Sequence, residues 1–166
     1  GSIFNFNKRA FELVCSSGAE EAIKRALRTS TSSVHVDETG INIAGKLCWL
    51  HGTSNQEWTY FFPHKKRGKE AMDEADILTH FQGVLCHDHW KPYYRYTDCA
   101  HALCNAHHLR ELERAWDHDE MKWAKNMQAL LKSINNAQID NGLILDESTQ
   151  AHYRLAYQKI LTEGDV

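Results

Sequence analysis

The chain has 166 residues, of which 42% are hydrophobic and 25% charged, the composition of a globular domain that can bury a core. No apolar run approaches the roughly 18 residues that a membrane span needs, and the formal net charge of −3 excludes a protein that binds nucleic acid through its overall charge. Its five cysteines, an odd number, favour reduced thiols in a cytoplasm over a framework of disulfide bonds.

The chain begins with helical patterns and then changes to strands. The helical patterns cover residues 4–14 and 19–28, and a polar segment at 29–33 marks the expected boundary. Alternating and aromatic runs, separated by short turns, then predict an antiparallel meander with strands at 34–43, 47–52 and 58–63.

The rest of the chain alternates helices with two further strands. The elements expected are a helix at 68–80, a buried strand at 83–88, a short helix at 90–96, a strand at 100–104, a long helical segment at 107–135 and a last helix at 148–161. Three antiparallel strands, a crossover helix and two more strands follow the order of an α/β fold with a ribonuclease H-like mixed five-stranded sheet flanked by helices.

Two acidic residues stand at the polar ends of strands that this fold makes neighbours. Asp37 lies in the run 33–39 and Asp88 ends the run 83–88. The first and fourth strands are expected to be parallel, so both carboxylates would meet at one edge of the sheet, where such sheets bind ligands. Either Asp alone is an ordinary strand-end residue, but the pair is typical of a site for hard divalent cations. Glu38 alternates to the opposite side and is interpreted as a solvated or supporting group.

Three blocks of the sequence, in this order, resemble the transposases of the insertion sequence 66 type. They are 35–39, 83–93 and 104–112, and the third is the most specific because of its Cys-x-Ala-His-x-x-Arg pattern. The resemblance covers about residues 30–135. Such transposases carry an Asp-Asp-Glu catalytic core, so the resemblance implies that Asp37 and Asp88 are its first two acids and bind Mg²⁺ or Mn²⁺.

The third acid of that core, a Glu, is expected in an Asn-Asn-x-x-Glu-Arg type of block beyond a helical insertion. Asn135 and Asn136 fit the start of this block, but position 139 is Ile. We therefore expect the third acid to lie outside this sequence, with Glu111 and Glu113 as the alternatives within it.

The resemblance also implies a division of the chain and a reaction. The parts expected are a helical linker region at 1–32, a ribonuclease H-like catalytic core, present in part, at 33–108, and a helical segment that starts an insertion at 109–166. The reaction is metal-dependent hydrolysis of a phosphodiester at the transposon end, followed by attack of the freed 3′-hydroxyl on target DNA. The partners would be transposon-end and target DNA, with a homo-oligomer assembled on DNA in a bacterial cytoplasm, at the nucleoid.

A dense basic run joins the third strand to the following helix. Its cations are Lys65, Lys66, Arg67 and Lys69, and they are either a solvated loop or a set of sequence-independent phosphate contacts. Arg67 resembles a basic residue often found at this point in the family. Arg110, in the third block, is a further candidate contact to DNA.

Cysteine and histidine side chains gather between residues 86 and 108. The Cys-x-His-x-x-Cys-x-x-His spacing of residues 99–107 raises a zinc hypothesis, but it is not the spacing of a finger or ribbon. Alternation along a strand would also separate these side chains, so Zn²⁺ is disfavoured. His89, His107 and His108 are predicted instead as neighbours of the metal edge, where they would position a phosphate or a water.

Aromatic residues cluster after Asp88. Tyr93 and Tyr96 are predicted to pack the short helix onto the sheet with their hydroxyls reaching solvent. Stacking of these rings on bases of single-stranded DNA is the weaker alternative.

Three other functions stay open. The chain could be a zinc-stabilised binding module without catalysis, an inactivated transposase remnant that binds DNA or serves assembly, or another nuclease of the same fold, such as a junction resolvase. Metal analysis distinguishes the zinc-stabilised module from the transposase. Cleavage that depends on Asp37 and Asp88 distinguishes the inactivated remnant, and assays of substrate range distinguish another nuclease.

Overall fold

The structure is a computed structural model that describes residues 2–142 and 144–164. The chain forms two compact units, residues 1–103 and 104–166, and each is described by itself. The first unit contains the sheet and the second contains only helices in its described part. The boundaries expected at residues 32 and 108 stay predictions.

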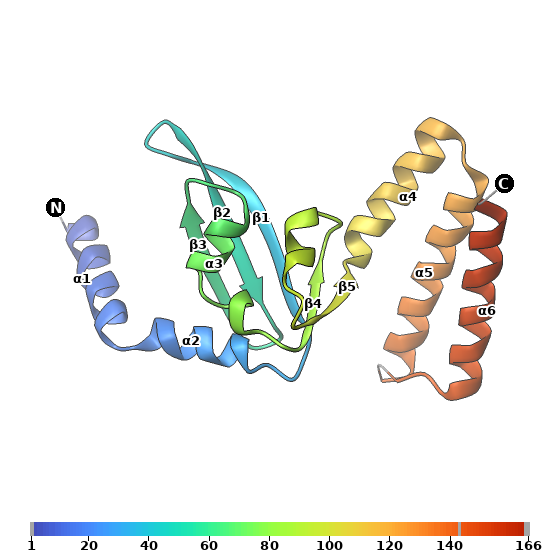
Figure 1. Cartoon of the computed structure of the whole chain (residues 1–166), viewed down its shortest axis with the longest axis horizontal. Helices are drawn as coiled ribbons and strands as arrows, with labels where there is room; N and C mark the ends of the chain where they lie inside the picture. Colours follow the sequence, from blue (N-terminus) through green and yellow to red (C-terminus); the bar gives the residue numbers. More distant parts are fainter. Residues whose placement is uncertain (1, 143, 165–166) are drawn as a thin grey trace. The chain divides into compact units, whose positions relative to one another are not determined.

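The first unit is built on a five-stranded sheet with the strand order β3-β2-β1-β4-β5. The strands are β1 (Val34–Ile43), β2 (Lys46–Ser54), β3 (Thr59–His64), β4 (Val84–His87) and β5 (Ala100–Leu103). β1, β2 and β3 are antiparallel neighbours, whereas β4 pairs parallel with both β1 and β5. This order and these directions confirm the ribonuclease H-like α/β fold (Figure 1).

Short turns fix the meander. β1 and β2 are joined by Ala44 and Gly45, both with positive φ (50° and 79°), as a two-residue hairpin turn requires. Between β2 and β3 the side chain of Asn55 accepts hydrogen bonds from the amides of Glu57 and Trp58, at 3.0 and 2.8 Å. The register of the meander therefore follows from turn residues that the sequence displays.

The core lies on one face of the sheet. Val34, Val36 and Leu85 turn their side chains to this face, where helices cover them. The covering elements are α2 (Ala19–Arg28), α3 (Lys69–Glu74) and the 3-10 helices η1 (Leu78–His80) and η2 (Lys91–Arg95). α3 crosses this face in Figure 1. On the opposite face Phe61 and Val84 are exposed.

The helix α2 belongs to this core through Leu27, whose side chain is fully buried. We expect Leu27→Ala to lower the free energy of unfolding by about 2–5 kcal/mol, because it removes buried methyl groups and leaves a cavity. Urea unfolding of both variants provides the measurement, with the exposed neighbour Arg25→Ala as the control that stays within about 0.5 kcal/mol. If Leu27→Ala and Arg25→Ala changed the free energy of unfolding equally, α2 would be a linker rather than part of the domain.

The helix expected at 68–80 is interrupted. α3 ends at Glu74, and Asp76 then adopts a left-handed conformation with φ 58° before η1. Arg28 holds this turn, because its Nε donates to the Asp76 carbonyl at 2.6 Å and its Nη2 to the Asp76 carboxylate at 2.5 Å. The prediction of one continuous helix was wrong since a contact with α2 stabilises the break. The segment after Asp88 is helical as predicted, in the 3-10 form.

The second unit consists of α4 (Asn105–Asp119), α5 (Lys122–Asp140) and α6 (Glu147–Gly164), which contact one another in sequence order (Figure 1). The segment predicted to be helical from 107 to 135 is helical, and the chain breaks it into two helices at Glu120, with φ 52°. The left-handed conformation of Glu120 ends α4, and the Met121 amide beyond it donates to the Ala115 carbonyl, although no Gly or Pro marks the position. No helix in residues 2–142 and 144–164 combines the length and apolar character that crossing a membrane requires.

The first helix, α1 (Ser2–Ser16), is exposed along its whole length. It precedes Gly18, whose φ of 74° turns the chain into α2. Together α1 and α2 confirm the two helical patterns expected before the sheet.

Candidate active site

The parallel pairing of β1 and β4 sets the two predicted acids at one level of the sheet. Val34 pairs with Leu85 and His35 with Cys86, so a residue of β4 stands 51 positions after its partner in β1. Asp88 stands 51 positions after Asp37 as well. Continuing this register two residues past the last pair would bring Asp88 beside Asp37, just beyond the end of β4 at His87, so the juxtaposition of the two acids stays a prediction.

Alternation along β1 decides which face carries the first acid. Val34, Val36 and Glu38 are buried, whereas His35, Asp37 and Thr39 are exposed, so Asp37 projects from the uncovered face. Gly52 is its partner on the other side, in β2. A Cβ at Gly52 would lie 3.6 Å from the Asp37 carbonyl oxygen and 3.4 Å from the Phe61 ring, both ordinary van der Waals contacts.

Both carboxylates are oriented by a nearby backbone amide. Asp37 accepts at Oδ1 from the amide of Glu38, and Asp88 accepts at Oδ1 from the amide of Trp90, each at 2.9 Å. Asp37 is exposed and Asp88 is half-buried. In each acid the second oxygen, Oδ2, has no hydrogen-bond partner among the described residues and is available to a ligand.

This donor set fits a hard divalent cation in kind. Carboxylate oxygens are the ligands that Mg²⁺ prefers, with waters completing its octahedron. Across residues 2–142 and 144–164 no group of three or more His, Cys, Asp or Glu side chains converges as a metal cage. Two acids from adjacent strands would therefore hold one ion weakly, and the Asp-Asp-Glu core needs a third carboxylate.

Glu38 is not solvated, which corrects one part of its interpretation from the sequence. Its side chain is only 1% exposed and lies on the covered face of the sheet, behind Asp37. The guanidinium of Arg67 donates from Nε and from Nη2 to Oε1 of Glu38, both at 2.7 Å, and the Tyr93 hydroxyl donates to Oε2. A buried carboxylate is stable here because a cation and a hydroxyl compensate it.

Arg67 is held between two aromatic rings as well as by Glu38. Its guanidinium lies 4.3 Å from the ring centre of Trp90 and 5.0 Å from that of Trp49, close enough for cation–π attraction. Its side chain remains 40% exposed. Arg67 therefore has a fixed position and still reaches the surface.

The hydroxyls of Tyr93 and Tyr96 do not reach solvent as the sequence analysis expected. Both residues are buried, and their hydroxyls donate to the carboxylates of Glu38 and Asp73. Burial raises the pKa of both phenols far above the ordinary value, and the neighbouring carboxylates raise it further. The two hydroxyls are buried because carboxylates beneath the short helix accept their hydrogen bonds, and composition does not reveal these partners.

This burial predicts an alkaline titration. Because the pKa of Tyr93 and Tyr96 is higher in the folded than in the unfolded chain, the free energy of unfolding is unaffected below about pH 10 and falls as the pH rises above it. Ultraviolet absorbance of tyrosinate should show at least two of the six tyrosines still protonated in the native protein at a pH where urea-unfolded protein is fully ionised. Coincident native and unfolded titrations would contradict the buried placement.

A histidine pair supports the backbone at Asp88 from the covered side. His87 is fully buried, and its Nδ1 donates to the carbonyl of Asp88. Its Nε2 is joined to Nδ1 of His101 at 2.8 Å, and Nε2 of His101 donates to the Tyr96 carbonyl at 3.0 Å. The sequence analysis placed both residues in a zinc-ligand pool, but all four ring nitrogens already have polar partners. Because the two outer nitrogens both donate to carbonyls, the bond between the rings requires a third proton on the pair. In the sequence, the only sign of this support for the Asp88 backbone was the polar His-Asp-His segment at the end of a buried strand.

Comparison with known families decides the relationship of the chain. A sequence model of the family described as "Transposase IS66 family" matches residues 3–164. The chain belongs to this family. The resemblance seen in the sequence is thereby confirmed, and the match extends it over the helices that precede and follow the sheet in the chain.

Two solved structures are similar to the IS66-family chain at low identity. It is similar to a chain of the simian T-cell lymphotropic virus intasome in complex with the PP2A regulatory subunit B56 gamma, at 9% identity and a TM-score of 0.37. This match covers 78% of the chain and 48% of that chain, so it spans about half of the viral protein. It is also similar to the HTLV-2 integrase catalytic core domain in complex with magnesium, in dimeric form, at 12% identity and a TM-score of 0.37, covering 79% and 83%. No protein of curated function matches the chain.

The other predicted site residues of the IS66-family chain divide between the two units. His89 lies next to Asp88 in the first unit and is exposed. The remaining five lie on α4 in the second unit: His107, His108, Arg110, Glu111 and Glu113. Arg110, Glu111 and Glu113 are exposed, and Nδ1 of His107 is buried without a hydrogen-bond partner. Their roles at the metal edge stay predictions.

The basic run is partly neutralised by acids of the first unit. Lys66 pairs with Glu70 at 2.6 Å and Lys69 with Asp73 at 2.7 Å. Arg67 is engaged by Glu38 at the same time. Within the described residues Lys65 makes no ion pair, so it is the cation of the run with the fewest competing contacts.

Proposed function

We propose that this chain carries part of the catalytic site of a DNA transposase, in which Asp37 and Asp88 hold a divalent cation, Mg²⁺ or Mn²⁺, against DNA. The observation that supports the proposal is the parallel pairing of β1 with β4 at Val34–Leu85 and His35–Cys86, whose continuation would bring the two acids to one edge of the sheet. Membership of the transposase family supports the DNA substrate. The open face around Asp37 gives a ligand access to both acids.

The chemistry proposed is hydrolysis of a phosphodiester at the transposon end followed by strand transfer to target DNA. Bound divalent ions lower the pKa of the attacking water or hydroxyl and stabilise the leaving oxygen. The residues of this chain would supply two carboxylates whose Oδ1 atoms are fixed by backbone amides and whose Oδ2 atoms point to the ligand. The third acid of the core would be a Glu outside this sequence, or else Glu111 or Glu113 on α4.

DNA would be held by sequence-independent contacts to its phosphates. Lys65, Lys66, Arg67 and Lys69 supply cations on the same unit as the two acids, and Arg110 supplies one on α4. His89, His107 and His108 would position a phosphate or a water at the edge. We propose a homo-oligomer on DNA as the working form and the nucleoid of a bacterial cytoplasm as its location.

The experiment that tests the function uses the full-length protein, in which the third acid is expected, with supercoiled plasmid DNA carrying a transposon end. Nicking or end cleavage should require Mg²⁺ or Mn²⁺ and should be abolished by EDTA. Cleavage that persists in EDTA would contradict a metal-dependent mechanism. Tight binding of one equivalent of Zn²⁺ without any cleavage would favour a zinc-stabilised binding module instead.

A further inference from the structure

The backbone pairing that aligns Asp37 with Asp88 stops before it reaches them. The last paired residues of β1 and β4 are His35 and Cys86, and β4 itself ends at His87. The backbone ladder alone therefore does not fix the separation of the two carboxylates. We define the brace as the group that connects the two segments there: Glu38, Arg67, Trp90 and Tyr93.

Arg67 contacts both of the residues that orient the acids. Glu38 donates its amide to Asp37, and Trp90 donates its amide to Asp88. Arg67 binds the Glu38 carboxylate through Nε and Nη2, and it stacks on the Trp90 ring. The two acid-bearing segments are thus joined through a single guanidinium.

Tyr93 makes a second connection between the same segments. It lies on η2, five residues after Asp88, and its hydroxyl donates to the other oxygen of the Glu38 carboxylate. Its ring also packs edge-on against Trp90, with centroids 5.6 Å apart. Glu38 therefore accepts one contact from the residue that precedes α3 and one from the segment that follows Asp88.

We propose that Arg67, with Tyr93 beside it, is a positioning residue that sets the separation of Asp37 and Asp88 and thereby the affinity of the metal site. The inference rests on the proposed function of the two acids. The brace lies on the covered face of the sheet and acts through the backbone amides rather than by touching the metal. Residues that orient metal ligands in this indirect way typically change metal affinity by about 10–100-fold when they are lost.

Binding of Mn²⁺ to the chain in the absence of DNA tests the proposal, because a contact between Arg67 and DNA would not affect it. Electron paramagnetic resonance reports free Mn²⁺ during a titration of wild type, Arg67→Gln, Arg67→Lys and Tyr93→Phe. We expect Arg67→Gln to weaken binding by about 10-fold or more. Tyr93→Phe keeps the ring and removes only the hydroxyl, so it should weaken binding in the same direction and by less. Lysine should not restore affinity, because it lacks the planar fork that binds Glu38 and stacks on Trp90.

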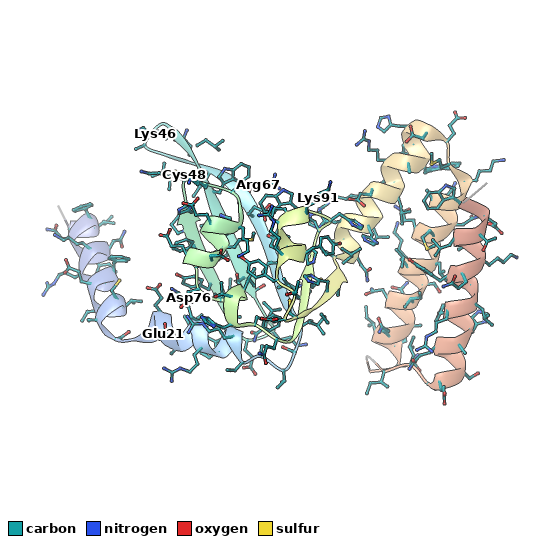
Figure 2. The ribbon with its side chains drawn as sticks, viewed as in Figure 1. Glu21, Lys46, Cys48, Arg67, Asp76 and Lys91 are labelled. Carbon is teal, nitrogen blue, oxygen red and sulfur yellow. The ribbon has the colours of Figure 1, made fainter. Side chains whose placement is uncertain are left out.

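Arg28→Gln is the matched control. Arg28 is also an arginine bound to a carboxylate, but its partner is Asp76, which lies well apart from Arg67 (Figure 2). It should destabilise the fold without changing the affinity for Mn²⁺. If Arg67→Gln does not fold, Tyr93→Phe alone decides, because it retains the packing of the ring.

The outcomes separate this inference from the proposed function. Loss of Mn²⁺ binding in Asp88→Asn, with unchanged affinity in folded Arg67→Gln and in Tyr93→Phe, would overturn the brace and leave the metal site standing. Mn²⁺ binding that is unaffected by Asp88→Asn would overturn the metal site itself. Full rescue by Arg67→Lys would show that only the charge matters, and this too would contradict a positioning role.

Discussion

Asp37→Asn and Asp88→Asn are each expected to lower metal-dependent cleavage of transposon-end DNA by about a thousandfold. Asn keeps the size of the side chain but removes the negative charge that a hard cation needs. Loss of a metal that supplies several kcal/mol of transition-state stabilisation corresponds to a rate loss of this order, since each 1.36 kcal/mol is about tenfold. Cleavage rates at saturating Mg²⁺ and Mn²⁺ provide the measurement.

Asp98→Asn is the control for these two variants. Asp98 is an exposed carboxylate of the same unit, between η2 and β5, and lies outside the site. Its substitution should leave the cleavage rate unchanged. Retention of wild-type cleavage by Asp37→Asn, in protein that unfolds at the same urea concentration, would exclude Asp37 from the site.

Glu38→Ala should lower the free energy of unfolding by about 3 kcal/mol. Removing one member of a buried ion pair usually costs 3–5 kcal/mol, because the other charge is left uncompensated, and the lower end applies since Arg67 is 40% exposed. The Tyr93 hydroxyl would lose its acceptor as well. Urea unfolding followed by circular dichroism measures the effect.

The matched comparison is Glu70→Ala, which removes an ion pair with Lys66 whose two side chains are more than 60% exposed. A surface pair of this kind contributes little to stability, because water and salt screen it. If Glu38→Ala changes stability as little as Glu70→Ala, the carboxylate of Glu38 is solvated, which was one of the two interpretations from the sequence, and the buried network is refuted.

The sheet was predictable because its signals are local. The turn at Ala44 and Gly45, the side-chain cap of Asn55 and the alternation of β1 each specify a short stretch of chain. The parallel neighbours β1 and β4 followed from the general handedness of crossover connections. Together these were enough to predict the sheet on which the proposed pairing of Asp37 and Asp88 rests.

The supporting contacts were not predictable, because they join residues far apart in the chain. The sequence leaves Glu38 as a solvated or supporting residue, because it does not show which side chains bind the carboxylate. These are Arg67, 29 positions later, and Tyr93, 55 positions later. The break in the helix after Glu74 depends in the same way on Arg28, 48 positions before Asp76. A single sequence shows the residues of such contacts but not their partners.

The functional part of the prediction came from short, specific blocks rather than from composition. The net charge of −3 and the ordinary hydrophobic content do not indicate DNA binding. The blocks around Asp37, Asp88 and the Cys-x-Ala-His-x-x-Arg pattern identified the family, which the match over residues 3–164 confirms. The third acid is different, because no block of the sequence places it.

A crystal of this chain soaked in Mn²⁺ tests the shared metal site most directly, through the anomalous scattering of the ion. The account predicts an anomalous peak within about 2.5 Å of a carboxylate oxygen of both Asp37 and Asp88. A peak bound to neither acid, or carboxylates separated by more than about 8 Å, would contradict it, because ions that stand about 4 Å apart in a two-metal site could not be shared across that gap.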